Sequence, residues 1–350
     1  MFFASDNAAP VAPEIMAALA AANQGFAMPY GNDAIMARVR TRLREVFEAP
    51  EAAIYLVATG TTANALSLAV CCPPWATVFC HRNAHIAEDE CGAPEFFTNG
   101  AKLTLVDGVA GKMTPAALRE SIANTARGGV HNVQRGMVSI TNITEAGTAY
   151  TAVEVAALTA VAREAGLPCH LDGARFANAL VATGATPAEM TWKAGIDVLS
   201  FGGTKNGLMG VEAVILFDPA KAWEFELRRK RAGHLFSKHR YLSAQMEAYL
   251  HDDLWLRLAG QANRAGARLA AGLKATPGAS LANPVPANLM FATLPRAAHR
   301  RAQGAGAAYY IMSPDAALEG PDDTPQLARF VTSWNTIDAE VDQFLSLIRG

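Results

Sequence analysis

The 350-residue sequence has few charged side chains and few aromatic ones, which limits the partners it can bind. Charged residues make up 18% and aromatic residues 8% of the chain, and the formal net charge is -2. A protein that binds nucleic acid or a membrane surface by electrostatics needs a strong basic surplus, and this chain has none. We therefore expect a small-molecule ligand, with no nucleic-acid partner and no membrane partner.

Cysteine is also scarce. The chain has five cysteines, an odd number, and none of them form a C-x-x-C pair, so no disulfide framework is expected and a cytoplasmic location fits. Hydrophobic residues make up 51% of the chain, yet no uncharged apolar run is long enough to span a bilayer. The N-terminal residues lack the basic lead-in of a secretory signal, and we expect no targeting segment.

Three common ligand-binding motifs are missing. Four potential zinc ligands lie close together in the sequence: Cys80, His81, His85 and Cys91. Their spacing does not match the paired ligands of structural zinc sites, so no metal is predicted. No G-x-G-x-x-G follows the first predicted strand, which argues against a Rossmann dinucleotide site. Lys205 is followed by Asn206, whereas the lysine of a P-loop is followed by Ser or Thr, and a P-loop ATPase is excluded.

One lysine has an unusual setting. Lys205 follows a strand-like apolar segment and lies in a loop that contains Gly202, Gly203, Gly207 and Gly210. A lysine in such a loop can be partly desolvated and can act as a nucleophile. An exposed loop lysine without a ligand is the more common case, so partners elsewhere in the sequence must decide between the two interpretations.

Apolar segments alternate with helical segments over the first 217 residues. Strands are predicted over residues 53–57, 77–80, 102–106, 137–141, 168–171 and 196–200. This alternation predicts an α/β fold with a largely parallel sheet that helices cover on both faces. Ligands of such sheets bind beyond the carboxyl ends of the strands.

The pattern changes after Phe217. A charged helix is predicted over residues 220–232, a long helical stretch over 241–273, and shorter strands and helices after that. We therefore divide the chain into a large domain, residues 1–252, which includes the N-terminal segment, and a smaller C-terminal α+β domain, residues 253–350.

Polar residues follow several predicted strands. The groups are residues 59–62, 142–145 and 172–175, together with Lys205. At residues 59–62 threonines surround Gly60 where a helix begins, which is the outline of a phosphate site, although an ordinary threonine cap remains the alternative. A lysine, a carboxylate such as Asp172, a phosphate site and an imidazole such as His85 are together what pyridoxal phosphate requires.

Seven motifs, spread over almost the whole chain, carry a family resemblance. They are Ser5-Asp6-Asn7, Tyr30-Gly31-Asn32-Asp33, Thr59-Gly60-Thr61-Thr62-Ala63-Asn64, His85 with Glu90 and Gly92, Asp172-Gly173-Ala174-Arg175, Gly203-Thr204-Lys205, and Arg329-Phe330-Val331-Thr332. In these motifs and their order the sequence resembles the low-specificity L-threonine aldolases of the fold-type-I pyridoxal-phosphate enzymes. The resemblance implies an aspartate-aminotransferase-like fold, with a mostly parallel seven-stranded sheet in the large domain and a smaller C-terminal α+β domain.

The resemblance also implies pyridoxal 5'-phosphate as cofactor. The implied cofactor-binding residues are Lys205, Asp172, Gly60, Thr61, His85, Arg175 and Thr204. Lys205 would carry the cofactor as a Schiff base, Asp172 would pair with the pyridine nitrogen, and His85 would stack on the ring. Gly60 and Thr61 would hold the phosphate.

The implied reaction is retro-aldol cleavage of L-β-hydroxy-α-amino acids, such as L-threonine, L-allo-threonine and L-phenylserine, to glycine and an aldehyde. The implied substrate-binding residues are Ser5, Tyr30, Arg175 and Arg329. Glu145 stands where many relatives have a histidine near the substrate hydroxyl, so it is either a proton acceptor, the holder of a water, or a loop residue that faces solvent. With Lys205, His85 and Asp172 it completes the predicted catalytic set.

A homo-oligomer, either a dimer or a dimer of dimers with a site shared between subunits, is also implied. Lys230, Arg231 and Lys238 are the candidates for a phosphate contact from the neighbouring subunit, and the sequence does not choose among them. Two alternatives to the aldolase remain open. One is another enzyme of the same fold, similar to serine hydroxymethyltransferase or a β-lyase, and the other is a non-catalytic binding protein.

Overall fold

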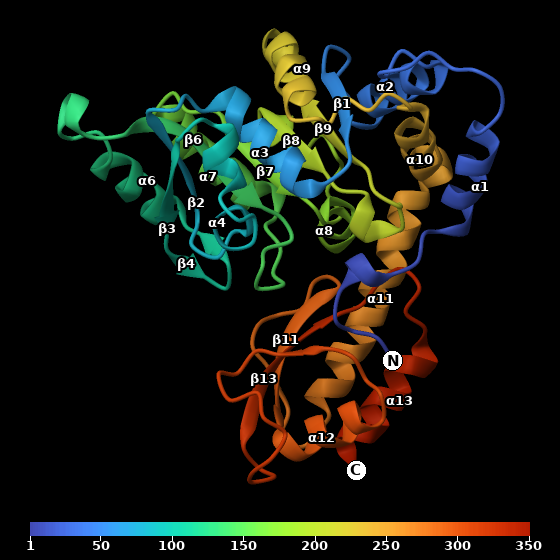
Figure 1. Ribbon diagram of the computed structural model, residues 1–350. Helices are drawn as coiled ribbons and strands as arrows, with labels where there is room; N and C mark the ends of the chain where they lie inside the picture. Colours follow the sequence, from blue (N-terminus) through green and yellow to red (C-terminus); the bar gives the residue numbers. More distant parts are fainter.

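The computed structural model describes residues 1–350, which form a larger upper unit and a smaller lower unit in the view of Figure 1. A seven-stranded sheet lies in the upper unit and a four-stranded sheet in the lower one. The helix α11 (Leu254–Lys274) runs from the upper unit down into the lower one, and both chain termini lie at the lower unit.

Seven strands form the sheet of the upper unit. In sheet order they are β1 (Ala53–Val57), β9 (Glu212–Leu216), β8 (Val198–Phe201), β7 (Cys169–Gly173), β6 (Gln134–Thr141), β2 (Ala76–His81) and β3 (Lys102–Val106). The five strands from β8 to β3 are parallel, whereas β9 is antiparallel to both of its neighbours. The predicted α/β fold with a mostly parallel seven-stranded sheet is confirmed.

Both faces of this sheet are buried, and successive side chains of β9 show the alternation directly. Ala213 and Ile215 belong to the large core on one face, while Val214 and Leu216 pack in a second core together with α3 (Gly60–Cys71). The other helices of this unit are α1 (Pro13–Ala22), α2 (Ala34–Val46), α4 (His85–Glu88), α5 (Ala93–Phe97), α6 (Pro115–Asn124), α7 (Ala152–Glu164), α8 (Phe176–Thr183), α9 (Ala222–Arg231) and α10 (Arg240–Leu250). A strand with both faces covered can be apolar throughout, and β1 from Ala53 to Val57 is an example.

Local capping explains where several helices begin. Asp33 caps α2, Thr59 caps α3 and Thr114 caps α6, each through a side-chain oxygen that accepts a backbone N–H of the first turn. Thr151 and Glu154 form a reciprocal capping box at the start of α7.

The chain also forms shorter elements. They are a two-stranded ribbon, β4 (Gly108–Val109) with β5 (Lys112–Met113), and six 3₁₀ segments. The segments η1–η6 are Asp6–Ala8, Gly129–His131, Trp192–Ala194, Thr204–Asn206, Pro219–Lys221 and His251–Asp253.

The lower unit is α+β, as predicted. Its antiparallel sheet has the order β10 (Ser280–Leu281), β11 (Leu289–Pro295), β13 (Pro325–Val331) and β12 (Tyr310–Ile311), and it packs with α11, α12 (Arg296–Gly304) and α13 (Asp338–Arg349). The helical stretch predicted over 241–273 is divided into α10 and α11, because Asp252 and Asp253 take positive φ angles of 47° and 52°. Residue 252 as the domain boundary stays a prediction.

The N-terminal segment packs with the lower unit. Phe3 is fully buried in the core of the C-terminal sheet, its N–H donates to Ala308 O at 2.7 Å, and its carbonyl accepts from Val331 N at 2.8 Å. The sequence grouped this segment with the large domain, since nothing in residues 1–5 points to a partner more than 300 residues away. The segment therefore connects the two units from the start of the chain.

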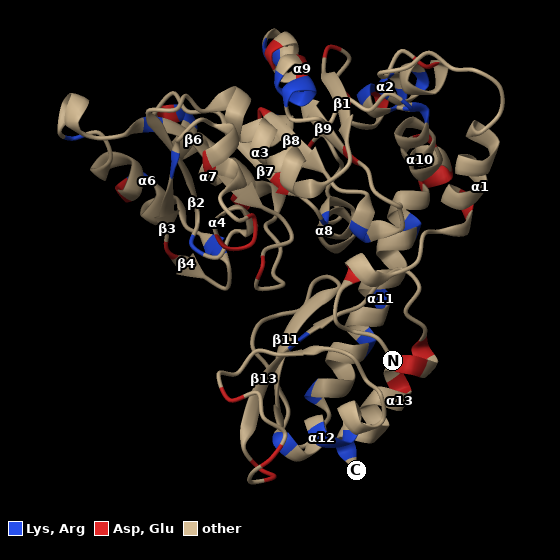
Figure 2. Cartoon of the chain, in the orientation of Figure 1, with Lys and Arg blue, Asp and Glu red and all other residues tan.

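Charged side chains of both signs are distributed over both units, and basic residues gather at the end of α9, where its last turn contains residues 228–231 (Figure 2). None of the helices has the combination of length and apolar composition that crossing a bilayer requires.

Candidate active site

A cavity of about 280 Å³ lies at the carboxyl ends of the parallel strands, against the start of α3. Its walls are formed by Asn7, Ala58, Thr59, Gly60, Thr61, Asn64, His85, Asp172, Ala174, Thr204, Lys205 and Glu212. The cavity thus gathers most of the residues that the sequence proposed for a cofactor. These are Lys205, Asp172, Gly60, Thr61, His85 and Thr204.

Lys205 lies in η4, directly after β8, in a backbone that other elements hold in place. Gly203 N–H donates to Glu212 Oε2 of β9 at 2.6 Å, and Asn206 Nδ2 donates to the Tyr249 hydroxyl of α10 at 2.7 Å. These contacts are made on either side of Lys205. The lysine is therefore presented to the cavity from a turn that is held on both sides.

Asp172 lies at the end of β7 and is 2% exposed. Its Oδ1 accepts from Ala174 N–H and its Oδ2 accepts from Asn64 Nδ2, both at 3.0 Å. Two donors orient this buried carboxylate at the cavity wall, where it can receive a further donor from a ligand.

Asn64 links Asp172 to a second acid–base pair. Its Nδ2 also donates to Glu90 Oε1 at 2.9 Å, and the same oxygen lies 2.8 Å from Nδ1 of His85. The hydrogen bond with Glu90 raises the pKa of His85, and burial raises the pKa of Glu90. The imidazole is therefore fixed at the cavity by a buried carboxyl group behind it.

The start of α3 can bind an anion. Thr59 Oγ1 accepts from Thr62 N–H at 3.2 Å, which leaves the N–H groups of Gly60 and Thr61 without an acceptor inside the helix. A Cβ added at Gly60 would meet no atom within 4 Å, so nothing obstructs the approach of a ligand there. His234, from the loop after α9, places its Nε2 2.9 Å from Thr62 Oγ1 and borders the same helix start. These free donors and the positive end of the helix dipole suit a phosphate.

Arg175 does not line the cavity. It is 4% exposed, and its Nε and Nη2 donate to the two carboxylate oxygens of Asp6 at 2.7 and 2.9 Å. Burial alone would raise the pKa of Asp6, but Arg175, together with Lys205 and Asn288, brings that pKa below its ordinary value. Two nitrogens of the Arg175 guanidinium are thus engaged in hydrogen bonds within the protein. The role of Arg175 toward cofactor or substrate stays a prediction.

Arg329 approaches Arg175 from β13 of the lower unit. Its Nη1 donates to Ala4 O at 3.0 Å. Burial lowers the pKa of Arg329, and the positive charge of Arg175 lowers it further, while the half-buried Glu145 of the loop after β6 opposes this. Two neighbouring guanidinium groups, with the Glu145 carboxylate close by, can bind the carboxylate of a substrate.

Two further predicted residues differ in their placement. Ser5 caps η1 by accepting from Asn7 N–H at 3.2 Å, and Asn7 itself lines the cavity. Tyr30 is 42% exposed and lies outside the cavity of its own chain, with Lys230 Nζ 5.1 Å from its ring centre and Ser237 Oγ 3.4 Å from its hydroxyl. A single chain does not bring Tyr30 to the site.

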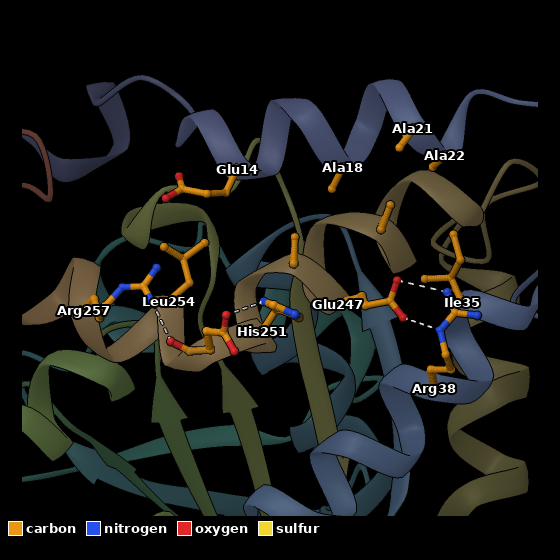
Figure 3. A pocket seen from close by; sticks show the side chains of 13 residues that line it. Glu14, Ala18, Ala21, Ala22, Ile35, Arg38, Glu247, His251, Leu254 and Arg257 are labelled. Atoms are coloured by element: carbon orange, nitrogen blue, oxygen red, sulfur yellow. Dashed lines mark hydrogen bonds and ion pairs between the residues drawn. The ribbon is translucent and has the colours of Figure 1, made fainter.

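A second cavity, of about 650 Å³, lies between α1, α2, α10 and α11 (Figure 3). Four of its titratable side chains form two pairs. Arg38 Nε lies 2.5 Å from Glu247 Oε1, and His251 Nδ1 lies 3.2 Å from Asp252 Oδ2. Nothing there resembles the donor set at Lys205, so the smaller cavity is the candidate active site.

Comparison with known proteins identifies the family. A family model described as beta-eliminating lyase matches residues 3–295. The chain belongs to the beta-eliminating lyase family. The low-specificity L-threonine aldolase of Pseudomonas aeruginosa is 42% identical over 334 residues, which cover 95% of this chain and 93% of that protein. A protein of the same name from a Pseudomonas species is 41% identical over 348 residues and covers 99% and 97%. The resemblance stated from the sequence motifs is confirmed.

Solved structures agree with this membership in the family. The structure of the threonine aldolase of Leishmania major matches with a TM-score of 0.91 and 29% identity, over 99% of this chain and 98% of that one. The serine palmitoyltransferase of Sphingomonas wittichii, 13% identical, matches with a TM-score of 0.70 over 100% of this chain and 86% of that one, and shares the fold.

Sequence reasoning gave no role to several residues that the structure places at the site. Asn64 and Glu90 lie within motifs that were recognised, but the sequence does not show that they connect His85 to Asp172. Glu212 and His234 lie outside those motifs. An acidic residue at the start of the apolar run 212–216 was the available signal for Glu212.

Proposed function

We propose that the chain is a pyridoxal-phosphate-dependent aldolase that cleaves L-β-hydroxy-α-amino acids, among them L-threonine, L-allo-threonine and L-phenylserine, to glycine and an aldehyde. The observation that carries the proposal is the convergence of Lys205, Asp172 and the start of α3 on one cavity. The names of the two Pseudomonas relatives and of the Leishmania protein support this activity.

The donor set of the cavity fits pyridoxal phosphate. Lys205 offers an amine for the aldehyde, and Asp172 offers a buried, oriented carboxylate for the ring nitrogen. Gly60 and Thr61 offer free N–H groups for the phosphate, and His85 offers an imidazole at the cavity wall. The aldehyde, the ring nitrogen and the phosphate of the cofactor therefore each have a partner of the right chemistry.

The cofactor, when bound, supplies an electron sink for the carbanion that forms as the Cα–Cβ bond of the substrate breaks. The chain supplies orientation and proton transfer. Arg329, with Arg175 and Ser5 nearby, binds the substrate carboxylate and so fixes the bond to be broken relative to the cavity. Glu145 or His85 accepts the proton of the β-hydroxyl, or holds the water that does so.

Proton transfer at neutral pH favours groups whose pKa lies near the working pH. The hydrogen bond between its Nδ1 and Glu90 raises the pKa of His85 above its ordinary value, so the imidazole at the cavity wall can hold a proton. Glu145 lies in the loop after β6, where its charge acts on both Arg175 and Arg329. A carboxylate there is close to where the bound substrate carboxylate would lie.

The experiment that tests the activity has two parts. The absorbance spectrum of the purified protein reports bound cofactor, and release of glycine and aldehyde from L-threonine and L-phenylserine reports cleavage. Borohydride reduction followed by peptide mapping should place the pyridoxyl group on Lys205, and Lys205→Ala should lack it. A pyridoxyl group on another lysine would contradict the assignment.

A second candidate activity is β-elimination, which the description of the family favours. The products distinguish the two reactions, since elimination yields an α-keto acid and ammonia, whereas retro-aldol cleavage yields glycine and an aldehyde. Formation of an α-keto acid in place of glycine would favour the elimination.

We also propose a homo-oligomer, a dimer or a dimer of dimers, in which Tyr30 reaches the site of a neighbouring copy. Tyr30 lies outside the cavity of its own chain, and the loop before it exposes Phe26 fully and Met28 by 65%. Exposed apolar side chains in one loop are typical of an interface. Light scattering gives the mass, and mixing Tyr30→Ala with Lys205→Ala subunits should restore activity, because a hybrid contains one intact site.

In such an oligomer one of Lys230, Arg231 and Lys238 would contact the phosphate across the interface. For the cellular location we propose the cytoplasm, because all five cysteines are unpaired, which fits a reducing compartment.

A further inference from the structure

His234 is a half-buried histidine beside the anion site, and the proposed chemistry gives it no role. Its Nε2 lies 2.9 Å from Thr62 Oγ1 in the first turn of α3, and its Nδ1 accepts from the backbone N–H of Ala58 at 3.5 Å. These two contacts lie on either side of the turn that joins β1 to α3. The imidazole therefore bridges residues 58–61, which line the cavity, without lining the cavity itself.

The end of α9 determines where His234 lies. Arg229 of that helix is 3% exposed, its Nη1 donates to the carbonyl of Leu56 in β1 at 3.3 Å, and its guanidinium lies 5.0 Å from the ring centre of Tyr55. Gly233 follows the helix with a φ of 78°, and His234 N–H donates back to the carbonyl of Arg229 at 3.0 Å. This left-handed turn ends α9 on top of β1, so the next side chain can reach the residue that follows β1.

A chain of hydrogen bonds runs from His234 to the cap of α3. Thr62 Oγ1, which faces His234 Nε2, also accepts from Thr59 Oγ1 at 2.9 Å, and Thr59 Oγ1 in turn accepts from Thr62 N–H at 3.2 Å. The N–H of Ala58 donates to no backbone carbonyl, so His234 is its acceptor. Removal of the imidazole would therefore loosen both the cap and the residue before it.

The partners of the two ring nitrogens determine where the proton of His234 lies. A backbone N–H can only donate, so Nδ1 accepts from Ala58, and Nε2 carries the proton and donates to Thr62 Oγ1. A second proton on Nδ1 would place two donors against each other at Ala58. The contacts therefore require a neutral imidazole, and burial, which lowers the pKa of His234, favours the same form.

We propose that His234 is the positioning residue of the phosphate site: from outside the cavity, its imidazole holds residues 58–62 in the arrangement that presents the free N–H groups of Gly60 and Thr61 to an anion. Donors that are already ordered bind an anion more tightly than donors that binding must first order. The inference rests on the proposed function for the identity of the anion, which is the phosphate of the cofactor.

The test compares two probes that differ only in the phosphate, pyridoxal 5'-phosphate and pyridoxal, on the full chain after removal of cofactor. Absorbance of the Schiff base gives a dissociation constant for each probe, and the ratio of the two constants reports the phosphate site. His234→Leu has no polar side-chain atom, so the preference for pyridoxal phosphate should fall about tenfold, the scale of one or two hydrogen bonds, while the affinity for pyridoxal stays unchanged. His234→Gln offers an amide N–H to Thr62 and should retain most of the preference.

Two further variants separate positioning from general destabilisation. Thr62→Val removes the hydroxyl that His234 contacts but keeps the shape of the side chain, and it should also lower the preference. Because both variants break one contact, the loss in the double variant with His234→Leu should be smaller than the sum of the single losses. The control is His299→Leu, since His299 contacts the Tyr309 hydroxyl at 2.9 Å and Gln326 O at 3.1 Å in the lower unit. It should lower stability and leave the ratio unchanged.

An unchanged ratio in His234→Leu overturns the inference, as does an equal loss of affinity for both probes, which would indicate a general effect on folding. If His234→Leu does not fold by circular dichroism, Thr62→Val decides the question, and an unchanged ratio there overturns the inference. A wild-type chain that binds both probes equally would overturn the proposed phosphate site itself. A wild-type preference for pyridoxal phosphate that survives in every variant would overturn only the role of His234, so the two failures are distinguishable.

Discussion

The amide of Asn64 donates to Oδ2 of Asp172 at 3.0 Å and thereby joins α3, which presents the anion site, to β7, which presents the carboxylate. The same amide nitrogen donates to Glu90 Oε1 at 2.9 Å. One buried amide thus orients two carboxyl groups at once. The orientation of Asp172 toward a ligand depends on a residue that does not itself need to touch the ligand.

Replacing Asn64 by alanine should destabilise the protein and loosen this orientation. Asp172 and Glu90 would both lose a buried donor, at a cost of about 2 kcal/mol in the free energy of unfolding. Urea unfolding followed by circular dichroism measures the loss, and the absorbance of bound cofactor reports its affinity. Asn178→Ala, which removes a buried amide that bonds Asn263 and does not line the cavity, is the matched control and should lower stability without changing cofactor affinity.

Asp172→Asn should fold and lose most of its activity. An amide keeps the shape of the side chain and an oxygen for Ala174 N–H, but it cannot stabilise a protonated ring nitrogen as a carboxylate does. We expect a loss in kcat of at least about a hundredfold, the scale of removing a preorganised electrostatic contact. Near-normal turnover with cofactor bound would contradict the role given to Asp172.

The pair of His85 and Glu90 should make stability fall as pH rises toward neutrality. The hydrogen bond to Glu90 raises the pKa of His85, and burial raises the pKa of Glu90, so both groups bind protons more tightly in the folded chain than in the unfolded one. Their contributions are present in full below the unfolded values, about 4.3 for Glu and 6.5 for His, and are lost as pH rises through the higher folded values.

Urea unfolding of the cofactor-free chain between about pH 5 and pH 8 measures this dependence. The free energy of unfolding of the wild type minus that of the double variant His85→Asn with Glu90→Gln should decrease as pH rises over that range. A difference that does not change with pH would show that this pair does not bind the protons.

The position of the site could be predicted from the sequence because apolar runs indicate the strands and where they end. Lys205 and Asp172 follow apolar runs, and carboxyl ends of parallel strands must meet at one edge of the sheet, so their proximity follows from the alternation of strands and helices. The threonines around Gly60 could be read as a helix start for the same local reason, since Thr59 caps α3.

Contacts between residues far apart in the chain had no such signal. Asp6 pairs with Arg175 across 169 positions and Asn64 with Asp172 across 108, and neither spacing carries information about distance in space. β9 was missed because an acidic residue, Glu212, opens its apolar run. Glu212 also lines the cavity. The residue that made the strand hard to recognise in the sequence is therefore a residue of the site.

Arg329→Lys should weaken substrate binding while the chain remains folded. Lysine keeps the positive charge but loses the planar fork that matches a carboxylate, so we expect KM for L-threonine to rise about tenfold or more with a smaller change in kcat. Steady-state kinetics measures both constants. Arg268→Lys, which alters a surface pair with Asp342 in the same unit, is the control and should leave KM unchanged. An unchanged KM in Arg329→Lys would return this arginine to a purely structural role through Ala4 O.

Glu145→Gln tests which group accepts the proton of the substrate hydroxyl. Glu145 is half-buried near two arginines, and a glutamine of the same size preserves the packing while removing the base. If Glu145 is the acceptor, cleavage of L-threonine should slow by about a hundredfold or more, the usual contribution of a general base, while binding of glycine, which has no hydroxyl, changes little. His85→Ala should impair both cleavage and glycine binding, because the imidazole lines the cavity that the ligand enters.

The measurements are the single-turnover rate of cleavage across pH and the affinity for glycine from the absorbance of bound cofactor. An unchanged rate and pH profile in Glu145→Gln would assign the proton to His85, whose pKa the hydrogen bond to Glu90 raises.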